Sequence, residues 1–438
     1  MSIISIIGPK GGIGKTTLSI NVTAALAGQS NPKGEKTQIC LIDLDLRLPT
    51  ISSILDSHPR KTFYDLFETL ANKTQQADTL QLLYRVVSVF KSYLRGDLSA
   101  GNPQLVKSLA LYKNINTDLF HFSDFKFGNA VYELFLQRSK VERPADLKAM
   151  ATLVENIDDM EIRAKMGEMR DNSRPLVADY VNYIEEYGFS IIGGEVPIMG
   201  KKNHRKRINE PAYLNLFLEF LDEVSERFDH VILDTPAGGV SHVSSLMNIM
   251  DHVLLVFDMS NRIAVNGSLD ALHSFIDYYE DFLDEFKCDR LTGLDKAYVN
   301  RLVSAHGHSA VEATLRGKKI GLLFNRCQSA EEIADCLKRM REYLDTLDKY
   351  EEYKNRIRIV GMMPQHKIIH ITNNQRTLFY DKDRQLKKRM DLIADSIHSD
   401  NPPPPSLACS DEEILNYLEK GVQSGFAKRF GRLAASFT

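Results

Sequence analysis

The sequence predicts an α/β fold with a doubly wound, mostly parallel sheet and a mostly helical insertion. Short apolar runs alternate with longer segments whose apolar residues recur at helical spacing. The short runs are continuously apolar, which is typical of strands buried on both faces of a parallel sheet. A glycine-rich loop joins the first run to the first helical segment.

The expected strands are spread over most of the chain. They are Ile3–Ile7, Ile39–Asp43, Ser190–Gly193, His230–Asp234, His252–Phe257, Lys319–Phe324 and Ile357–Gly361. The helical segments that alternate with them are Thr17–Ala27, Ala212–Arg227, Val265–Phe286, Ala330–Tyr350 and Lys382–Ile397. This βα alternation indicates a sheet with helices on both faces.

The loop after the first strand predicts nucleotide binding. Residues 8–17 read GPKGGIGKTT and contain Gly14, Lys15 and Thr16 in the order of the P-loop pattern. Glycines let backbone N–H groups approach phosphate oxygens, Lys15 would place its charge on the β- and γ-phosphates, and the Thr16 hydroxyl can coordinate Mg²⁺. A chance glycine-rich turn is the alternative, but the strand-then-helix context favours a P-loop NTPase fold. The expected nucleotide contacts here are Gly11, Gly12, Gly14, Lys15, Thr16 and Thr17.

Two further strands end in aspartate, at the sheet edge where ligands of parallel sheets bind. Asp234 is expected to hold Mg²⁺ through water, and Asp43 to support the loop that follows it or the water shell of the metal. Thr16, Asp43 and Asp234 are therefore the metal candidates. Asp45 is the candidate for orienting the attacking water. An aspartate at a strand end is often only a turn former, so the prediction rests on the combination with the P-loop.

Lys10 is a second lysine in the loop, which an ordinary P-loop does not need. The run KGGIGKT from Lys10 to Thr16 resembles the deviant Walker A motif of the MinD/ParA family of ATPases. The resemblance implies that Lys10 reaches across a dimer interface to the phosphates of the partner subunit, whereas a solvated loop charge is the alternative. It also implies that Asp45 is the switch I aspartate and that Asp234–Gly239 is switch II. Lys10, Lys15 and Asp45 are thus the expected catalytic residues.

The resemblance extends to the segment that reads the base. The strand Lys319–Phe324 is followed by Asn325 and Arg326, and an asparagine can both donate to and accept from adenine. Its alternative role is that of a turn residue at a strand end. The loop around Pro364, after the last strand, resembles the one that closes over the base. The implied cofactors are ATP and Mg²⁺.

Composition agrees with a nucleotide-binding protein of the cytosol. The chain has 438 residues, 43% of them hydrophobic, and a net charge of −3, so no basic field indicates nucleic-acid binding. Its five cysteines form no C-x-x-C pair, which predicts reduced thiols rather than a disulfide framework or a zinc site. The sequence has no apolar stretch of membrane-spanning length, and we expect no signal peptide because the apolar N-terminal run lacks a basic region and leads directly into the glycine-rich loop.

The predicted organisation has four parts. Residues 1–58 and 189–398 form the ATPase domain, residues 59–188 a helical insertion, residues 399–410 a Pro-rich linker, and residues 411–438 an amphipathic tail helix. Helical patterns in the insertion cover Phe63–Leu70, Thr79–Leu94, Ala130–Gln137, Ala145–Ile157 and Leu176–Tyr187. The insertion either recognises a partner or only adds stability. A second, shorter insertion is expected at Cys288–Gly317.

The tail has the pattern of an interfacial membrane helix. Its apolar residues fall on one face and its basic ones on another, and it resembles the C-terminal membrane-targeting helix of MinD. The apolar face consists of Leu415, Val422, Phe426, Phe430, Leu433 and Phe437. A helix packed on its own core or on a dimer partner is the alternative.

These features together predict a Mg²⁺-dependent ATPase that dimerises with ATP and cycles on and off the membrane to position a cellular structure or cargo. It would be cytoplasmic and peripheral at the inner face of the cell membrane, with an activating or cargo protein bound through residues 59–188. A ParA-like partition ATPase on DNA is the runner-up. The basic run Lys201–Arg207 could contact DNA phosphates, but DNA is the weaker assignment because the chain is slightly acidic. A bacterial tyrosine kinase and a weakly hydrolysing, nucleotide-gated scaffold rank below these.

Overall fold

The structure is a computed structural model that describes residues 2–31, 33–45, 50–57, 59, 61–115, 126, 128–171, 177–194, 211–236, 250–346, 350–398 and 403–419. The chain divides into two compact units. The first, here called the sheet unit, comprises Met1–Asp65, Leu176–Asn203 and Phe217–Thr438. The second, here called the helical unit, comprises Leu66–Pro175 and His204–Leu216.

The sheet unit contains an eight-stranded sheet in the order β3-β4-β2-β5-β1-β6-β7-β8. All its pairs are parallel except β3 with β4, so the predicted doubly wound, mostly parallel sheet is confirmed. The strands are β1 Ser2–Ile7, β2 Ile39–Asp43, β3 Asn182–Ile184, β4 Phe189–Ile192, β5 His230–Asp234, β6 His252–Asp258, β7 Lys319–Cys327 and β8 Ile357–Pro364.

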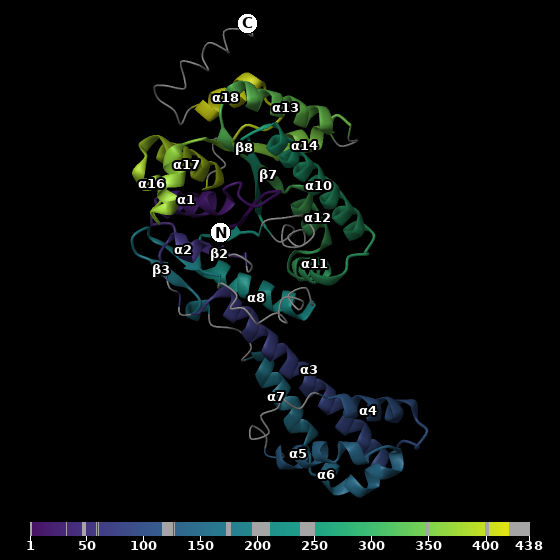
Figure 1. Cartoon of the computed structure of the whole chain (residues 1–438). Helices are drawn as coiled ribbons and strands as arrows, with labels where there is room; N and C mark the ends of the chain where they lie inside the picture. The colour runs from purple at the N-terminus through teal and green to yellow at the C-terminus, as the bar shows by residue number, and fades with distance from the viewer. Residues whose placement is uncertain are drawn as a thin grey trace. The chain divides into compact units, whose positions relative to one another are not determined.

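Helices cover both faces of this sheet (Figure 1). On one face α1 (Lys15–Ala27) and α17 (Arg384–His398) pack together, and alternate strand residues such as Ile4, Ile6 and Leu254 join their core. On the other face α10 (Arg262–Lys287) packs on β6 and α13 (Ala330–Leu344) packs on β7. Successive strand residues point to opposite faces, so these continuously apolar strands contribute side chains to the hydrophobic core on each face of the sheet.

The remaining elements of the sheet unit are mostly short helices. They are α2 Ile51–Ile54, α8 Pro211–Arg227, which begins in the helical unit, α11 Gly293–His306, α12 His308–Arg316, α14 Tyr350–Arg356, α15 Lys367–Asn374, α16 Phe379–Lys382 and α18 Asp411–Glu419. Helices α11 and α12 fill most of the predicted second insertion. Their buried side chains, Val299 and Leu315 among them, form a small core with the second half of α10.

The helical unit has a hydrophobic core of its own. Its elements are α3 Phe63–Leu94, which begins in the sheet unit, α4 Pro103–Asn114, α5 Gly128–Leu136, the 3-10 helices Arg138–Lys140 and Pro144–Met150, α6 Ala151–Glu155 and α7 Asp159–Asp171. The fully buried Tyr112 ring packs edge-on against Phe90 at 5.5 Å between centroids and stacks on Phe135 at 5.8 Å. Rings in these arrangements stabilise a core beyond the area they bury.

One predicted helix is wrong. Leu176–Tyr187 contains the 3-10 helix Val177–Asp179 and the edge strand β3, which pairs antiparallel with β4. Gly188 adopts a φ of +71°, which allows the tight reversal between the two strands. Strand pairing has overridden a helix-like apolar spacing. In addition, Phe63–Leu70 and Thr79–Leu94 belong to the single helix α3.

The segment before the tail is packed on the sheet unit. Leu407 is completely buried, and the backbone on either side of Ser406 pairs with the edge of β8 through Ile359 N–Pro405 O (2.8 Å) and Leu407 N–Ile357 O (2.9 Å). Prolines at 403–405 are tolerated there because an edge position leaves their missing N–H groups without consequence. Part of the predicted Pro-rich linker is therefore paired with the edge of β8.

Helix α18 continues this packing. Ile414 and Leu418 are buried, α18 contacts β8 and α13, and Arg341 of α13 binds Asp411 at 2.6 Å. Residues 420–438, which carry most of the predicted apolar tail face, lie outside the described residues.

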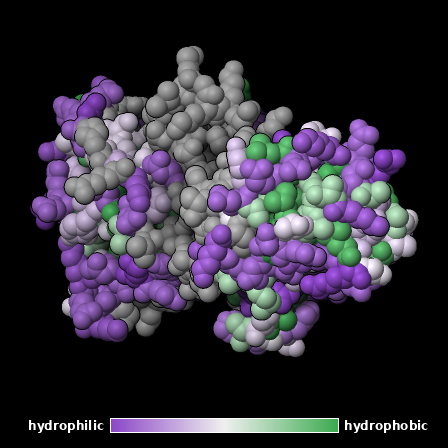
Figure 2. Space-filling view, turned by 90° about the horizontal axis from the view of Figure 1, so that it is seen from below, coloured by the Kyte–Doolittle hydropathy of each residue, from purple (hydrophilic) through white to green (hydrophobic). Residues whose placement is uncertain are grey.

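On the face shown in Figure 2, described side chains are mostly hydrophilic, and the hydrophobic ones lie mainly in the right-hand part of the view with hydrophilic ones between them. Such scattered apolar exposure is usual for folded proteins. Among the described helices, none is long and apolar enough to cross a membrane.

Candidate nucleotide-binding site

The loop between β1 and α1 forms the floor of the site. Gly12 and Gly14 have φ angles of +76° and +90°, a region that side chains with a Cβ rarely adopt. A Cβ on Gly14 would also come within 2.7 Å of the Asn325 amide nitrogen. The position five before Gly14, where the strict P-loop pattern has its first glycine, is Pro9. The predicted loop therefore differs from the general pattern at that position.

Lys15 lies inside this loop with only 6% of its surface exposed. Its Nζ donates a hydrogen bond to the Lys10 carbonyl at 3.2 Å, which folds the side chain back along the loop. Burial lowers the pKa of Lys15, while the nearby charges of Asp234 and Asp45 act in the opposite direction. A buried cation at the N-terminal end of α1 is suited to bind an anion such as a phosphate.

Asp234 lies directly below the loop and is almost completely buried. It accepts hydrogen bonds from Thr16 Oγ1 at 2.7 Å and Ser19 Oγ at 2.8 Å. Burial raises its pKa to about 6, an effect that the two hydroxyl donors and Lys15 oppose. A hydroxyl and a carboxylate side by side are hard oxygen ligands, so Thr16 and Asp234 fit the needs of Mg²⁺.

Asp43 is completely buried and holds the following loop. Its carboxylate accepts backbone N–H groups of Asp45 (3.0 Å), Thr50 (3.2 Å) and Ile51 (3.3 Å). Burial, together with the charge of Asp234 on the neighbouring strand, raises its pKa to about 8. Asp43 thus holds the start of this loop, and its role toward the water shell of a metal stays a prediction. Residues 46–49, beyond Asp45, lie outside the described part of the loop.

Asn325 and Arg326 connect the end of β7 to the P-loop. Asn325 donates to the Ile13 carbonyl at 2.6 Å and accepts the Arg326 N–H at 3.0 Å. Arg326 has a left-handed φ of +61°, and its guanidinium donates to the Gly12 carbonyl. Each polar atom of the Asn325 amide thus already has a protein partner, and base recognition by Asn325 stays a prediction.

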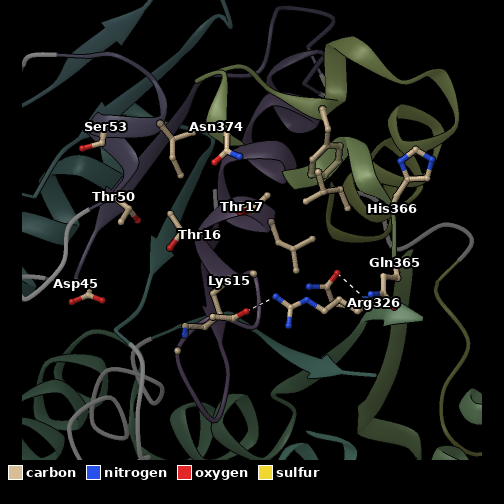
Figure 3. A pocket seen from close by; sticks show the side chains of 18 of the residues that line it. Lys15, Thr16, Thr17, Asp45, Thr50, Ser53, Arg326, Gln365, His366 and Asn374 are labelled. Atoms are coloured by element: carbon tan, nitrogen blue, oxygen red, sulfur yellow. Dashed lines mark hydrogen bonds between the residues drawn. The ribbon is translucent and has the colours of Figure 1, made fainter. Parts of the chain in front are cut away.

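These residues surround a cavity of about 680 Å³, a volume typical of small-molecule and cofactor sites. Figure 3 shows Asp45, Thr50 and Ser53 on one side of Lys15 and Thr16, and Arg326, Gln365 and His366 on the other. The sequence-predicted residues that line the cavity are Gly11, Gly12, Gly14, Lys15, Thr16, Thr17, Asp45, Asn325, Arg326 and Pro364. Asp43 and Asp234 do not line it and instead support its floor from beneath.

Lys10 does not line the cavity of its own chain. Its side chain is 50% exposed, and its Nζ lies 3.7 Å from an oxygen of Asp258, whose side chain is only 2% exposed. Sequence reasoning missed Asp258, which ends β6. The signal was available, because the sequence places an aspartate after an apolar run there, as it does at Asp43 and Asp234.

Comparisons with known proteins place this site in a family. Residues 4–378 match the family model described as the CobQ/CobB/MinD/ParA nucleotide binding domain. The chain belongs to this family. Its fold and its P-loop are therefore those of a nucleotide-binding domain, as the sequence predicts. No curated protein sequence matches the chain.

Three solved structures show similarity to this chain at low sequence identity. The cell division ATPase MinD of Pyrococcus furiosus is 14% identical, with a TM-score of 0.42 over 90% of this chain and 98% of that chain. The MinC:MinD complex of Aquifex aeolicus is 11% identical, with a TM-score of 0.42 over 91% and 95%. An ATP complex of a McdA variant from Cyanothece is 13% identical, with a TM-score of 0.45 over 90% and 95%.

Proposed function

We propose that this protein is a Mg²⁺-dependent ATPase switch that forms a homodimer with ATP and cycles on and off a membrane to position a cellular structure or cargo. The observation that carries the proposal is that two lysines of one loop occupy different positions relative to the cavity. Lys15 is buried against its own cavity, whereas Lys10 is half-exposed and lies outside it. A lysine placed in that way is available to the phosphates of a second copy.

The residues of the cavity supply the parts that phosphoryl transfer to water needs. Lys15 and the loop N–H groups bind the phosphates, and Asp45 is held by the Asp43 network at a position where it can orient a water molecule. Thr16 and Asp234 would hold Mg²⁺, which neutralises charge on the transferred phosphate when it is bound. Lys10 of the second copy would add a further positive charge only in the dimer.

Dimerisation and ATP hydrolysis would together control where in the cell the protein is located. Pairing of two chains would pair two weak membrane-binding tails and so increase avidity, and hydrolysis would separate them again. We therefore expect a cytoplasmic protein that is peripheral at the inner face of the cell membrane. The helical unit is the proposed docking part for an activating or cargo protein. It exposes the apolar side chains Val106, Tyr132, Leu136 and Met160.

Replacing Lys10 by alanine is expected to separate binding from dimerisation. ATP affinity should change by less than about three-fold, because Lys10 does not line its own cavity and a half-exposed charge has little effect on a distant phosphate. ATP-dependent dimerisation and turnover should both be lost. Analytical ultracentrifugation with and without ATP measures the first, and phosphate release the second.

The matched control is Lys338→Ala, which removes a 72%-exposed lysine on α13. It should dimerise like the wild type. A normal ATP-dependent dimer of the Lys10→Ala variant would show that this lysine does not act on a partner subunit.

Replacing Asp45 by alanine is expected to stop the cycle in the ATP state. The phosphate contacts of Lys15 and Thr16 remain, so ATP binding and dimerisation should persist. Hydrolysis should fall by about 100-fold or more, since the residue that positions the water is gone. Single-turnover kinetics with radiolabelled ATP measures the rate, and gel filtration measures the accumulated dimer. Wild-type turnover in this variant would place the water-orienting role on another residue.

A further inference from the structure

Three charged side chains meet where β6 and β7 end beside the P-loop. Asp258 and Asn325 are register partners on these strands, so Arg326 follows directly beside Asp258. The Asp258 carboxylate lies 3.7 Å from Lys10 Nζ and 3.6 Å from Arg326 Nη1. The same carboxylate accepts the Ser260 N–H at 3.2 Å.

The two cations differ in how firmly they are held. Arg326 is held by a hydrogen bond from its guanidinium to the Gly12 carbonyl in addition to its ion pair with Asp258. Lys10 is half-exposed. Among the residues that the structure describes, its Nζ forms an ion pair with Asp258 alone. Lys10 can therefore leave while Arg326 stays. Asp258 would keep one counter-ion, which matters because a buried carboxylate without a partner is costly.

We propose that Asp258 is a positioning residue that holds Lys10 on its own chain and thereby opposes ATP-dependent pairing with a second copy. The inference rests on the proposed function, in which Lys10 acts on the phosphates of the partner subunit. Each chain must then give up one Lys10–Asp258 ion pair before the dimer closes. Asp258 thereby weakens ATP-dependent dimerisation. Arg326 stays beside the buried carboxylate and so lowers the energetic cost of releasing Lys10.

The experiment compares ATP-dependent dimerisation of the wild type, Asp258→Asn and Asp258→Glu by sedimentation equilibrium. Breaking an ion pair with one half-exposed partner changes the dimerisation affinity by about three-fold. Because two such pairs are broken per dimer, Asp258→Asn should raise the dimerisation affinity about ten-fold. Asp258→Glu keeps the negative charge, so its dimerisation affinity should be close to that of the wild type. The control Asp270→Asn removes an exposed carboxylate from α10 and should leave the dimer unchanged.

A second measurement probes the Lys10–Asp258 ion pair in the nucleotide-free protein. In the nucleotide-free wild type, reductive methylation of Lys10, followed by mass spectrometry, should be several-fold slower than that of Lys338, which is 72% exposed. Asp258→Asn should remove this protection without altering the methylation of Lys15, a change that general loss of structure would not produce. Equal rates for Lys10 and Lys338 in the wild type would overturn the inference.

The outcomes separate the two proposals. If the wild type dimerises with ATP and folded Asp258→Asn dimerises no more tightly, Asp258 does not restrain Lys10 and the inference is wrong. If neither dimerises at any ATP concentration, the proposed function fails and the inference fails with it. A tighter Asp258→Asn dimer that loses its gain when Lys10 is also replaced by alanine would support both.

Discussion

ATP binding is expected to be lost when Lys15 is replaced by alanine. Lys15 is the buried cation of the cavity, with 6% of its surface exposed. Removing one partner of a buried, hydrogen-bonded charge pair costs about 2–5 kcal/mol, which corresponds to a loss of affinity of about 30- to 5000-fold. The effect should be at the upper end, because the nearby negative charges of Asp234 and Asp45 would then repel the phosphates without the opposing charge of Lys15.

Isothermal titration calorimetry with ATP and Mg²⁺ measures this loss. The matched control is Lys10→Ala in the same loop, which should retain ATP affinity. Thermal unfolding of the apo protein distinguishes lost binding from lost structure. ATP affinity within a few-fold of the wild type for Lys15→Ala would show that the phosphates do not bind in this loop.

The central sheet could be predicted from the sequence because its strands bury both faces. Such strands are continuously apolar, and the seven expected strands all occur in the structure as β1, β2 and β4–β8. Strand β3 could not be predicted in this way. It is a three-residue edge strand whose residues are exposed or half-buried, so its apolar pattern carried no strand signal. Its strand conformation depends on pairing with β4, which the local sequence does not specify.

The candidate site was predictable where chemistry demands a fixed spacing along the chain. Gly14, Lys15 and Thr16 are neighbours in sequence, so the motif contains the geometry. The contacts of Asp258 with Lys10 and Arg326 join residues far apart in sequence, and only the register of β6 and β7 brings them together. The same holds for Gln365, His366 and Arg376, which line the cavity from the end of β8 and the loop after α15.

The described part of the tail is covered by protein. Ile414 and Leu418 in α18 are buried against the sheet unit. The predicted apolar face beyond them, Val422 to Phe437, lies outside the described residues. A periodic apolar pattern states that a face will be buried, but not whether protein or lipid will cover it. The boundary between core helix and tail therefore has to be tested by substitution.

Membrane binding is expected to be lost when Phe430 is replaced by glutamate. If residues 420–438 bind as an interfacial helix, burial of a phenylalanine ring contributes about 1.5–3 kcal/mol, and a carboxylate at the same depth adds a desolvation cost. The loss occurs in both tails of the dimer. Co-sedimentation with anionic vesicles in the presence of ATP should fall to background, while ATP hydrolysis without lipid should stay unchanged.

Two controls make the result specific. Phe430→Leu keeps an apolar side chain and should retain most of the binding. Ile414→Ala removes a completely buried side chain of α18 and should lower the free energy of unfolding by about 2–5 kcal/mol, with vesicle binding of the folded protein preserved. The opposite pattern is the informative failure. A Phe430→Glu protein that co-sediments normally but unfolds at a lower temperature would show that the tail packs against the protein as α18 does, and the location of the switch would then depend on a partner rather than on lipid.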